Sequence, residues 1–271
     1  MELGLKGKRA LVTGSSSGIG IGIAKMLAAE GVSVVVHGRD ATRAQGTAKQ
    51  IEEGGGIAAV AIGDLSTDAG AKSVAEAALA AFGGVDILVN NAGGRAGTGD
   101  NSSWLAVDSN DWAATYQANV ISAVRMIRHL APKMIERGWG RIIQIASTLG
   151  ASPIPTEPDY CASKVAMYTL TLGLSKALSN TGVTVNAISP GMIYTPGLEL
   201  FLNDVASRMG FGSDRAKTEA FVLKEFVPQT VSRMGQPEDV GAIVLYLASP
   251  IADFVNGANW RVDGGMSRSI S

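Results

Sequence analysis

Three side chains in the second half of the chain have the types and the spacing that acid–base chemistry needs. Of the five tyrosines, only Tyr160 is followed four residues later by a lysine, Lys164. Residues four apart share one face of a helix, so the Lys164 ammonium can lie near the phenol. An unperturbed tyrosine has a pKa near 10, and a nearby cation supplies part of the stabilisation that lowers it. With Ser147 thirteen residues earlier, at the end of an apolar segment, we predict a general acid–base group; the alternative is an ordinary amphipathic pair.

A glycine-rich stretch near the start, LVTGSSSGIG (Leu11 to Gly20), permits two interpretations. Its inner five residues fit G-x-S-x-G, the turn that presents the nucleophilic serine of many hydrolases, and would make Ser16 the nucleophile. Its glycines Gly14, Gly18 and Gly20 instead form a turn that lets the backbone approach a pyrophosphate at a helix N-terminus.

The position of the turn favours the phosphate-binding interpretation. A hydrolase turn normally follows several strands, because one oxyanion donor comes from an upstream loop, and only ten residues precede Leu11. A hydrolase also needs a downstream histidine, and only His37, at a strand end, and His129, within a helix, exist. A dinucleotide-binding turn, by contrast, is expected between the first strand and the first helix.

The residues after the second predicted strand favour NADP(H) over NAD(H). Cofactors without a 2′-phosphate usually meet a carboxylate there, whereas an arginine accommodates the phosphate. The segment VVVHGRD places Arg39 at this position, and a guanidinium can donate two hydrogen bonds to a phosphate. Asp40 follows directly and keeps NAD(H) as the alternative.

Composition excludes several other classes of function. The 271 residues carry 23 Lys and Arg against 24 Asp and Glu, so nothing indicates binding to nucleic acid or to a membrane. A single cysteine, Cys161, and two histidines exclude an internal disulfide and predict no metal site. The start of the chain lacks an apolar signal region, and no apolar run is long enough to span a membrane. We therefore expect a soluble, cytoplasmic protein that acts on small molecules.

Strand and helix patterns alternate along the chain and must position these residues. Short apolar runs with turn residues after them indicate strands, and longer amphipathic stretches indicate helices. The alternation predicts an α/β fold: one doubly wound, Rossmann-type domain over residues 1–271, with about seven parallel strands and helices on both faces. One long amphipathic helix is expected over residues 110–137, and residues 192–235 show a broken helical pattern with four phenylalanines.

Five motifs, in this order and spacing, resemble the short-chain dehydrogenase/reductase family, including its 3-oxoacyl-carrier-protein reductases. They are TGSSSGIG, NNAG, Ser147, YCASK and SPG. By position, the resemblance implies a catalytic tetrad of Asn119, Ser147, Tyr160 and Lys164. Tyr160 would exchange the proton, Ser147 would hold the substrate oxygen, Lys164 would bind the nicotinamide ribose and acidify the phenol, and Asn119 would hold a water.

The turn, Arg39 and the resemblance together give the predicted cofactor-binding residues. The resemblance adds an adenine contact at Asp64, a segment along the adenosine and a segment over the nicotinamide. The full set is Gly14, Ser16, Ser17, Gly18, Ile19, Gly20, Arg39, Asp64, Leu65, Asn91, Ala92, Gly93, Tyr160, Lys164, Pro190, Gly191, Ile193 and Thr195.

These features predict an oxidoreductase that transfers a hydride between NADP(H) and a ketone or secondary alcohol, a carbonyl reductase reversible as an alcohol dehydrogenase. The family resemblance implies a homo-oligomer, commonly a tetramer. Residues 94–111 and 192–235 leave strand ends on the ligand side and are expected to cover the substrate, with apolar side chains that suit an apolar ketone; packing between subunits is the alternative. A carrier-bound substrate would need a basic patch, for which Arg125, Arg128, Arg137 and Lys176 are candidates. The alternative functions are a catalytically silent cofactor-sensing or scaffolding protein and a serine hydrolase that uses Ser16.

Overall fold

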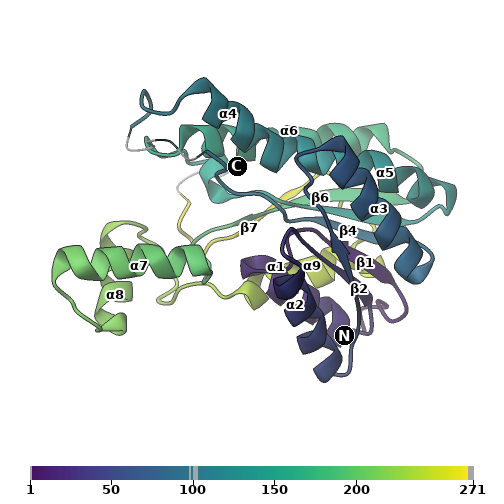
Figure 1. Ribbon diagram of the computed structural model, residues 1–271, viewed down its shortest axis with the longest axis horizontal. Coiled ribbons are helices and arrows are strands. Elements are labelled where there is room, and N and C mark those ends of the chain that lie inside the picture. The colour runs from purple at the N-terminus through teal and green to yellow at the C-terminus, as the bar shows by residue number, and fades with distance from the viewer. Residues whose placement is uncertain (1, 98, 100–102, 268–271) are drawn as a thin grey trace.

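The centre of the molecule is a parallel sheet of seven strands in the order β3-β2-β1-β4-β5-β6-β7 (Figure 1). The computed structural model describes residues 2–97, 99 and 103–267. All six pairs of neighbouring strands in this sheet are parallel, as the alternating sequence pattern predicts. The strands are β1 (Arg9–Val12), β2 (Ser33–Gly38), β3 (Ile57–Ile62), β4 (Ile87–Asn90), β5 (Gly140–Ile145), β6 (Val183–Pro190) and β7 (Asn259–Val262).

Helices cover both faces of this sheet, which confirms the doubly wound architecture (Figure 1). One face carries α1 (Gly18–Ala29), α2 (Ala41–Glu53) and α9 (Pro237–Ala248), and α1 packs along α9. The other face carries α3 (Asp68–Phe82), α5 (Ser122–Glu136) and α6 (Pro158–Ala177), with α4 (Ser109–Tyr116) packed on α6.

The central strands form continuous apolar runs because both of their faces are buried. Alternate residues of each strand enter separate cores: in β1, Ala10 and Val12 contact the α1 and α9 side, and Leu11 contacts the α3 and α5 side. The strand order reverses between β1 and β4, where consecutive crossovers leave toward opposite edges of the sheet. In open α/β sheets, ligands bind outside the carboxyl ends of the strands at this reversal.

The predicted single helix over residues 110–137 is interrupted. It consists of α4, a π-helical segment η1 (Gln117–Ile121) and α5. A π turn adds a residue to the helical ring, and such segments are common at functional sites. The π-helical segment contains Asn119, whose side-chain amide bonds to the loop after β4 instead of facing solvent. The sequence periodicity alone does not reveal this insertion.

Residues 192–235 form a lobe that projects from the sheet (Figure 1). The lobe contains α7 (Pro196–Met209) and α8 (Arg215–Glu225), which pack on each other around a small apolar cluster of their own. Its four phenylalanines contact each other edge to face, with ring centroids 5.4–5.9 Å apart. A single parallel bridge, from Ile193 to Gly235, joins the two connections between the lobe and the sheet.

Two short 3-10 turns complete the described structure. One, η2 (Thr148–Gly150), follows the end of β5, and the other, η3 (Pro250–Ala252), follows α9. The first turns the chain from Ser147 toward α6, whose first turn carries Tyr160.

Candidate active site

A cleft of about 980 Å³ lies at the carboxyl ends of the strands. Its walls come from the segments that follow β1, β2, β3 and β4 and from the ends of β5 and β6. Tyr160 and Lys164 reach it from α6, and Thr195 reaches it from the start of the lobe. The sheet therefore brings together residues that lie as much as 180 positions apart in the sequence.

The glycine-rich turn forms the part of the cleft at the N-terminus of α1. Gly14 and Gly18 both have left-handed backbone, with φ of 65° and 56°, which favours glycine. A Cβ on Gly14 would lie 2.8 Å from the Cα of Ala92, so the turn packs directly against the loop after β4. Ser17 is the N-cap of α1, and its side chain accepts no amide hydrogen bond. The first amides of a 12-residue helix are thus available to an anion, which fits a pyrophosphate.

The serine-hydrolase interpretation of this turn lacks a base. The Nδ1 of His37 accepts the Gly14 amide at 2.9 Å, and its Nε2 lies 3.1 Å from the carbonyl oxygen of Gly63. Both ring nitrogens therefore bond to backbone groups instead of a serine hydroxyl. His129, the other histidine, is exposed on α5, which lies on the opposite face of the sheet from α1.

Two arginines stand at the end of the cleft that is formed by β2. Arg39 is exposed and lines the cleft, and Arg43, from the first turn of α2, lines it as well. Asp40 does not line the cleft, because its carboxylate caps α2: it accepts the amide of Arg43 at 3.0 Å, and this bond lowers the pKa of Asp40. The position after β2 therefore carries two arginines that line the cleft, and Arg43 is ion-paired with Asp40, with 3.3 Å between Nε and Oδ2. Arg43 was not identified from the sequence, where the residue had no motif to single it out.

Asp64 lines the same end of the cleft from the turn after β3. Its Oδ1 accepts the amide of Ser66 at 2.9 Å, and this bond lowers the pKa of Asp64. The carboxylate stays ionised at neutral pH and keeps other lone pairs for a ligand.

Ser147, Tyr160 and Lys164 meet at the other end of the cleft. Ser147 is 8% exposed after the end of β5, and its Oγ accepts the amide of Leu149. The Nζ of Lys164 lies 5.4 Å from the centre of the Tyr160 ring and donates to the carbonyl oxygen of Ile145 at 2.9 Å. The predicted helical pair and the predicted serine are thus brought to one place.

Burial is the largest influence on the acidity of Tyr160. Burial raises the pKa of Tyr160 to about 12, and the hydrogen bond with Ser147 offsets only part of this effect. The amine of Lys164 donates to the carbonyl oxygen of Ile145, and burial lowers the pKa of this amine to about 8. At neutral pH the phenol holds its proton and can donate it.

Asn119 does not line the cleft. It is 2% exposed, and its amide donates to the carbonyl oxygens of Gly94 at 2.7 Å and Thr115 at 2.9 Å. Its Oδ1 accepts the amide of Gly94 at 2.9 Å. Asn119 thereby ties the loop after β4 to the π-helical segment, an arrangement that sequence position alone did not reveal.

Most of the predicted cofactor-binding residues line this cleft, and two do not. Gly20 is buried in α1, where a Cβ would lie 2.5 Å from the carbonyl oxygen of Gly14, so it allows the turn to pack. Ile193 is 6% exposed and packs in the core beside Gly235. The others, from Gly14 to Thr195, line the cleft as a group.

Sequence reasoning missed a hydrogen-bonded chain behind Ser147. The hydroxyl of Tyr168 donates to the carbonyl oxygen of Ser147. Ser189 Oγ lies 3.0 Å from that hydroxyl and 2.7 Å from Oδ1 of Asn259 on β7. Tyr168 lies two helical turns after Tyr160 on α6, and this spacing is the one feature of the sequence that could have indicated its place behind the site.

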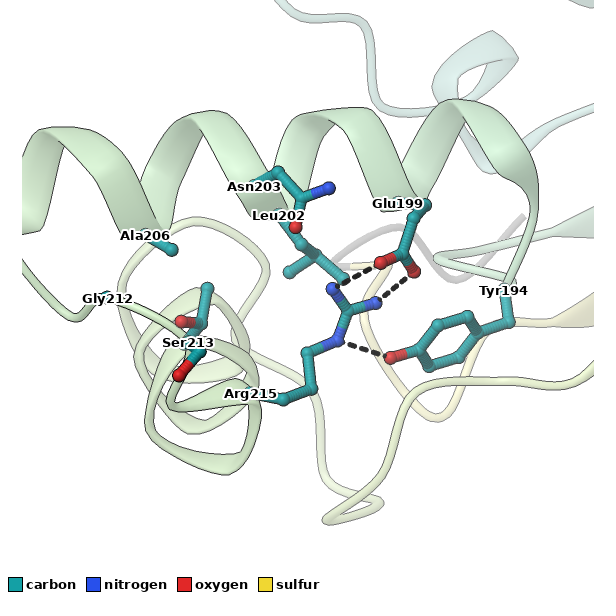
Figure 2. Close-up of a pocket in the computed structure, with 9 residues that line it drawn as sticks. Tyr194, Glu199, Leu202, Asn203, Ala206, Gly212, Ser213 and Arg215 are labelled. Carbon is teal, nitrogen blue, oxygen red and sulfur yellow. Dashed lines mark hydrogen bonds and ion pairs between the residues drawn. The ribbon is translucent and has the colours of Figure 1, made fainter.

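A second, smaller pocket of about 330 Å³ lies in the lobe and shares no residue with the cleft (Figure 2). Arg215 of α8 donates to both carboxylate oxygens of Glu199 on α7, at 3.1 and 2.6 Å, and to the hydroxyl of Tyr194 at 2.7 Å (Figure 2). It also bonds to Glu219, one turn along α8. The guanidinium is fully engaged, so this pocket offers no free cation to a ligand.

The lobe phenylalanines do not line the cleft, in contrast to the expected apolar cover. They pack on each other inside the lobe. Of the other predicted covering segment, residues 98 and 100–102 lie outside the described residues. Among residues 2–97, 99 and 103–267, no group of three or more potential ligands could hold a metal ion, and no helix is long and apolar enough to cross a membrane.

Comparison with known proteins gives one family. The sequence model described as short chain dehydrogenase matches residues 8–204. The chain is 38% identical to the D-beta-hydroxybutyrate dehydrogenase of Cupriavidus necator, over 96% of this chain and 98% of that one. It is 31% identical to the 3-oxoacyl-[acyl-carrier-protein] reductase of Aquifex aeolicus, over 98% of this chain and all of that one.

Solved structures with the same fold contain nicotinamide cofactors. The L-sorbose reductase of Gluconobacter frateurii, complexed with NADPH and L-sorbose, superposes with a TM-score of 0.91 at 34% identity over all of both chains. A 7 alpha-hydroxysteroid dehydrogenase complexed with NADH superposes with a TM-score of 0.84 at 31% identity, over all of this chain and 98% of that one.

Proposed function

Because the chain belongs to the short-chain dehydrogenase family, we propose that it is a carbonyl reductase that uses NADPH to reduce a ketone to a secondary alcohol, and that the reaction is reversible. The observation that carries this proposal is the convergence of Ser147, Tyr160 and Lys164 on the same cleft as the N-terminus of α1. The cleft volume, about 980 Å³, is large enough for a dinucleotide and a small substrate.

The proposed chemistry divides between the cofactor and the side chains. The bound nicotinamide supplies the hydride. Ser147 Oγ donates a hydrogen bond to the substrate carbonyl oxygen, and the Tyr160 hydroxyl gives its proton to that oxygen as negative charge develops. A phenol that is protonated at neutral pH suits this direction of reaction. Lys164 and the amides at the start of α1 hold the cofactor, at its ribose and its pyrophosphate.

We propose that Arg39, together with Arg43, binds the 2′-phosphate and gives the protein its preference for NADPH. Both arginines line the cleft after β2, whereas Asp40 does not line it: its carboxylate caps α2 and pairs with the Arg43 side chain, which a bound 2′-phosphate would have to draw away. A preference for NADH is the alternative, because the 7 alpha-hydroxysteroid dehydrogenase of the same fold was solved with NADH. Rates measured with both cofactors distinguish the two.

Small ketones and the corresponding alcohols are the proposed substrates. The cleft that contains Tyr160 is also lined by Gly94, Arg95 and Ala96 and by Gln117 of the π-helical segment, a mixed polar wall. The basic residues that a carrier protein would need are partly neutralised, because Arg125 pairs with Asp68 and Arg137 with Asp86. We propose that residues 192–235 cover the substrate, since Thr195 and Pro196 at their start line the cleft.

A panel of ketones and alcohols, assayed with NADPH and with NADH, tests this function. It should contain 3-oxo acids, keto sugars and oxosteroids, because relatives in sequence or fold are named for such substrates. We expect NADPH-dependent reduction of at least one class, which is lost in Tyr160→Phe. The absence of any turnover, with either cofactor bound, would support a silent cofactor-sensing protein instead.

A homotetramer in the cytoplasm remains the proposed state of the protein. The tetramer rests on what is common in the family, and the compartment rests on the single cysteine, Cys161, which fits a reducing environment. Light scattering at several protein concentrations measures the first of these.

A further inference from the structure

His37 connects the glycine-rich turn to two strands of the sheet. It is 3% exposed near the end of β2, between the turn after β1 and the turn after β3. The Gly14 amide donates to Nδ1 at 2.9 Å, and Nε2 lies 3.1 Å from the carbonyl oxygen of Gly63. An amide can only donate and a carbonyl can only accept, so the ring is neutral and carries its single proton on Nε2.

The backbone of His37 holds the next residue of the same turn. Its carbonyl oxygen accepts the amide of Ser15 at 2.9 Å, and its own amide donates to Ser15 Oγ at 3.0 Å. On the other side, the side-chain amide of Asn91 donates to the carbonyl oxygen of Gly14 at 3.1 Å. Gly14, with its φ of 65°, is therefore held at both ends, by His37 through N–H and by Asn91 through C=O.

We propose that His37 is a positioning residue for the cofactor: its neutral ring sets the shape of the pyrophosphate-binding turn, and the affinity for the cofactor falls when the ring takes a second proton. This inference rests on the proposed cofactor site. A proton on Nδ1 would face the N–H of Gly14, so one donor would meet another and the bond would be lost. The turn would then lose the contact that fixes its first peptide.

The surroundings of the ring set the pH at which this happens. Burial is the main cause that lowers the pKa of His37 below 6.5, and Arg39 on the same strand end acts in the same direction. The bond to Gly63 and the charge of Asp64, from the turn after β3, oppose this shift. The ring is therefore neutral at pH 7. Because the folded pKa lies below 6.5, the neutral ring and its bonds are fully present at pH 6.5 and above and are lost as the pH falls through that depressed pKa.

Binding titrations test the proposal without a substrate. The dissociation constant of NADPH, followed by its fluorescence, is measured from pH 5 to pH 8 for the wild type, His37→Phe and His37→Asn. Phe keeps a ring but has no acceptor, so we expect binding about tenfold weaker at pH 7.5. Asn retains an acceptor close to the Nδ1 position and does not titrate, so we expect affinity within about threefold of the wild type at pH 7.5.

The pH dependence distinguishes positioning from general destabilisation. The ratio of the wild-type dissociation constant to that of His37→Asn should rise as the pH falls from 7.5 to 5, by up to about tenfold, the loss expected for His37→Phe. This ratio cancels the titration of the 2′-phosphate, whose second pKa lies near 6 in phosphate monoesters. NADH, which lacks that phosphate, should give the same change in the ratio. His129→Asn removes the exposed histidine of α5, the only other histidine, and should reproduce the wild-type profile.

Two results would overturn the inference. One is a ratio that stays constant over this pH range; the other is an ¹⁵N spectrum of the histidine rings in the cofactor-free protein at pH 7.5 that places the His37 proton on Nδ1. A wild type that binds neither NADPH nor NADH at pH 7.5 would instead refute the proposed function. The spectrum still decides the tautomer if His37→Phe fails to fold.

Discussion

Two regions of the molecule are built from different interactions: the glycine-rich turn, which we propose binds the cofactor, and the α7–α8 lobe. The turn is held by main-chain groups and by buried side chains that bond to them, such as His37 to Gly14 and Asn91 to Gly14. The lobe is held by side chains on side chains: Arg215 bonds to Glu199, and four phenylalanine rings stack edge to face. A single backbone bridge between Ile193 and Gly235 closes its base.

This difference suggests how one fold serves several substrates. Main-chain geometry changes little when side chains are replaced, so a site made from it can keep one ligand. A lobe held by side-chain contacts can change shape when those side chains change. Relatives in sequence or fold are named for a hydroxybutyrate, a sugar and a steroid. We propose a division in which the sheet and its flanking helices hold the cofactor and the proton donor, and the lobe selects the substrate.

Removing the proton donor from the sheet side should have the largest effect. In Tyr160→Phe we expect kcat for ketone reduction to fall by about 10² to 10⁴, since a general acid contributes that much. NADPH binding should change little, because the ring remains. Tyr116→Phe is the matched control: Tyr116 is an exposed tyrosine of α4 outside the cleft. Steady-state kinetics with fluorescence titration checks both, and undiminished turnover in Tyr160→Phe would contradict the assignment.

The buried charge of Lys164, beside Tyr160 on α6, should lower the stability of the folded protein. Burial lowers the pKa of Lys164 from 10.5 to about 8, which costs the folded state roughly 3 kcal/mol below pH 8. This cost shrinks as the pH rises from 8 to 10.5, because the unfolded lysine also loses its proton. Lys164→Met should therefore raise Tm at pH 7 by roughly 5 °C, less at pH 10, while it abolishes activity.

Lys176→Met, an exposed change near the end of the same helix, should leave Tm unchanged at both pH values. Differential scanning calorimetry measures these differences. A Tm of Lys164→Met below that of the wild type would show that the bond to Ile145 outweighs the burial of the charge.

Cofactor choice should depend on the arginines beside the sheet and not on the lobe. Arg39→Met should raise the KM for NADPH about 10- to 100-fold, because charge-assisted hydrogen bonds to a phosphate contribute about 1.5–3 kcal/mol. The KM for NADH should change less than about threefold. Initial rates with both cofactors check this, with Lys49→Met on the exposed side of α2 as the control. Equal losses for the two cofactors would contradict a role in binding the 2′-phosphate.

Weakening the contacts within the lobe should have the smallest effect on catalysis, and it should change the KM for the substrate alone. Arg215→Met removes the bonds to Glu199 and Tyr194, so we expect the substrate KM to rise about three- to tenfold with the KM for NADPH unchanged. Arg208→Met breaks an exposed ion pair within α7 and should do neither. Kinetics with each reactant varied in turn separates the two constants. An equal rise in the KM for the substrate and the KM for NADPH would contradict the proposal that the lobe affects the substrate alone.

Much of the fold could be predicted because its pattern is local. Apolar runs that alternate with amphipathic stretches predict a parallel sheet with helices on both faces, and the structure confirms seven strands. The break at Gln117–Ile121 was missed, since no residue pattern in the sequence marks a π-helical turn. The mutual packing of the lobe phenylalanines was missed too, since periodicity does not say whether an aromatic face meets a ligand or its own neighbour.

Residues of the candidate site could be predicted where a short sequence motif by itself fixes their position in the fold. The glycine turn, the Tyr160–Lys164 pair and Ser147 each imply a position at a strand end or on a helix face. Arg43, Tyr168 and the role of His37 were not predictable in this way, because each acts through a partner that is distant in sequence or carries no recognisable pattern.

The sequence by itself determined the order of strands and helices, the flexible glycine backbone at the turn and the residue types that can move a proton, since these depend on neighbours a few positions apart. Only the tertiary structure decided the acidity of those groups. The fold buries Tyr160 and Lys164 and directs the Lys164 amine to Ile145, and this burial raises the pKa of the phenol and lowers the pKa of the amine. The energy of a charge depends on everything packed around it, and spacing along the chain does not specify that environment.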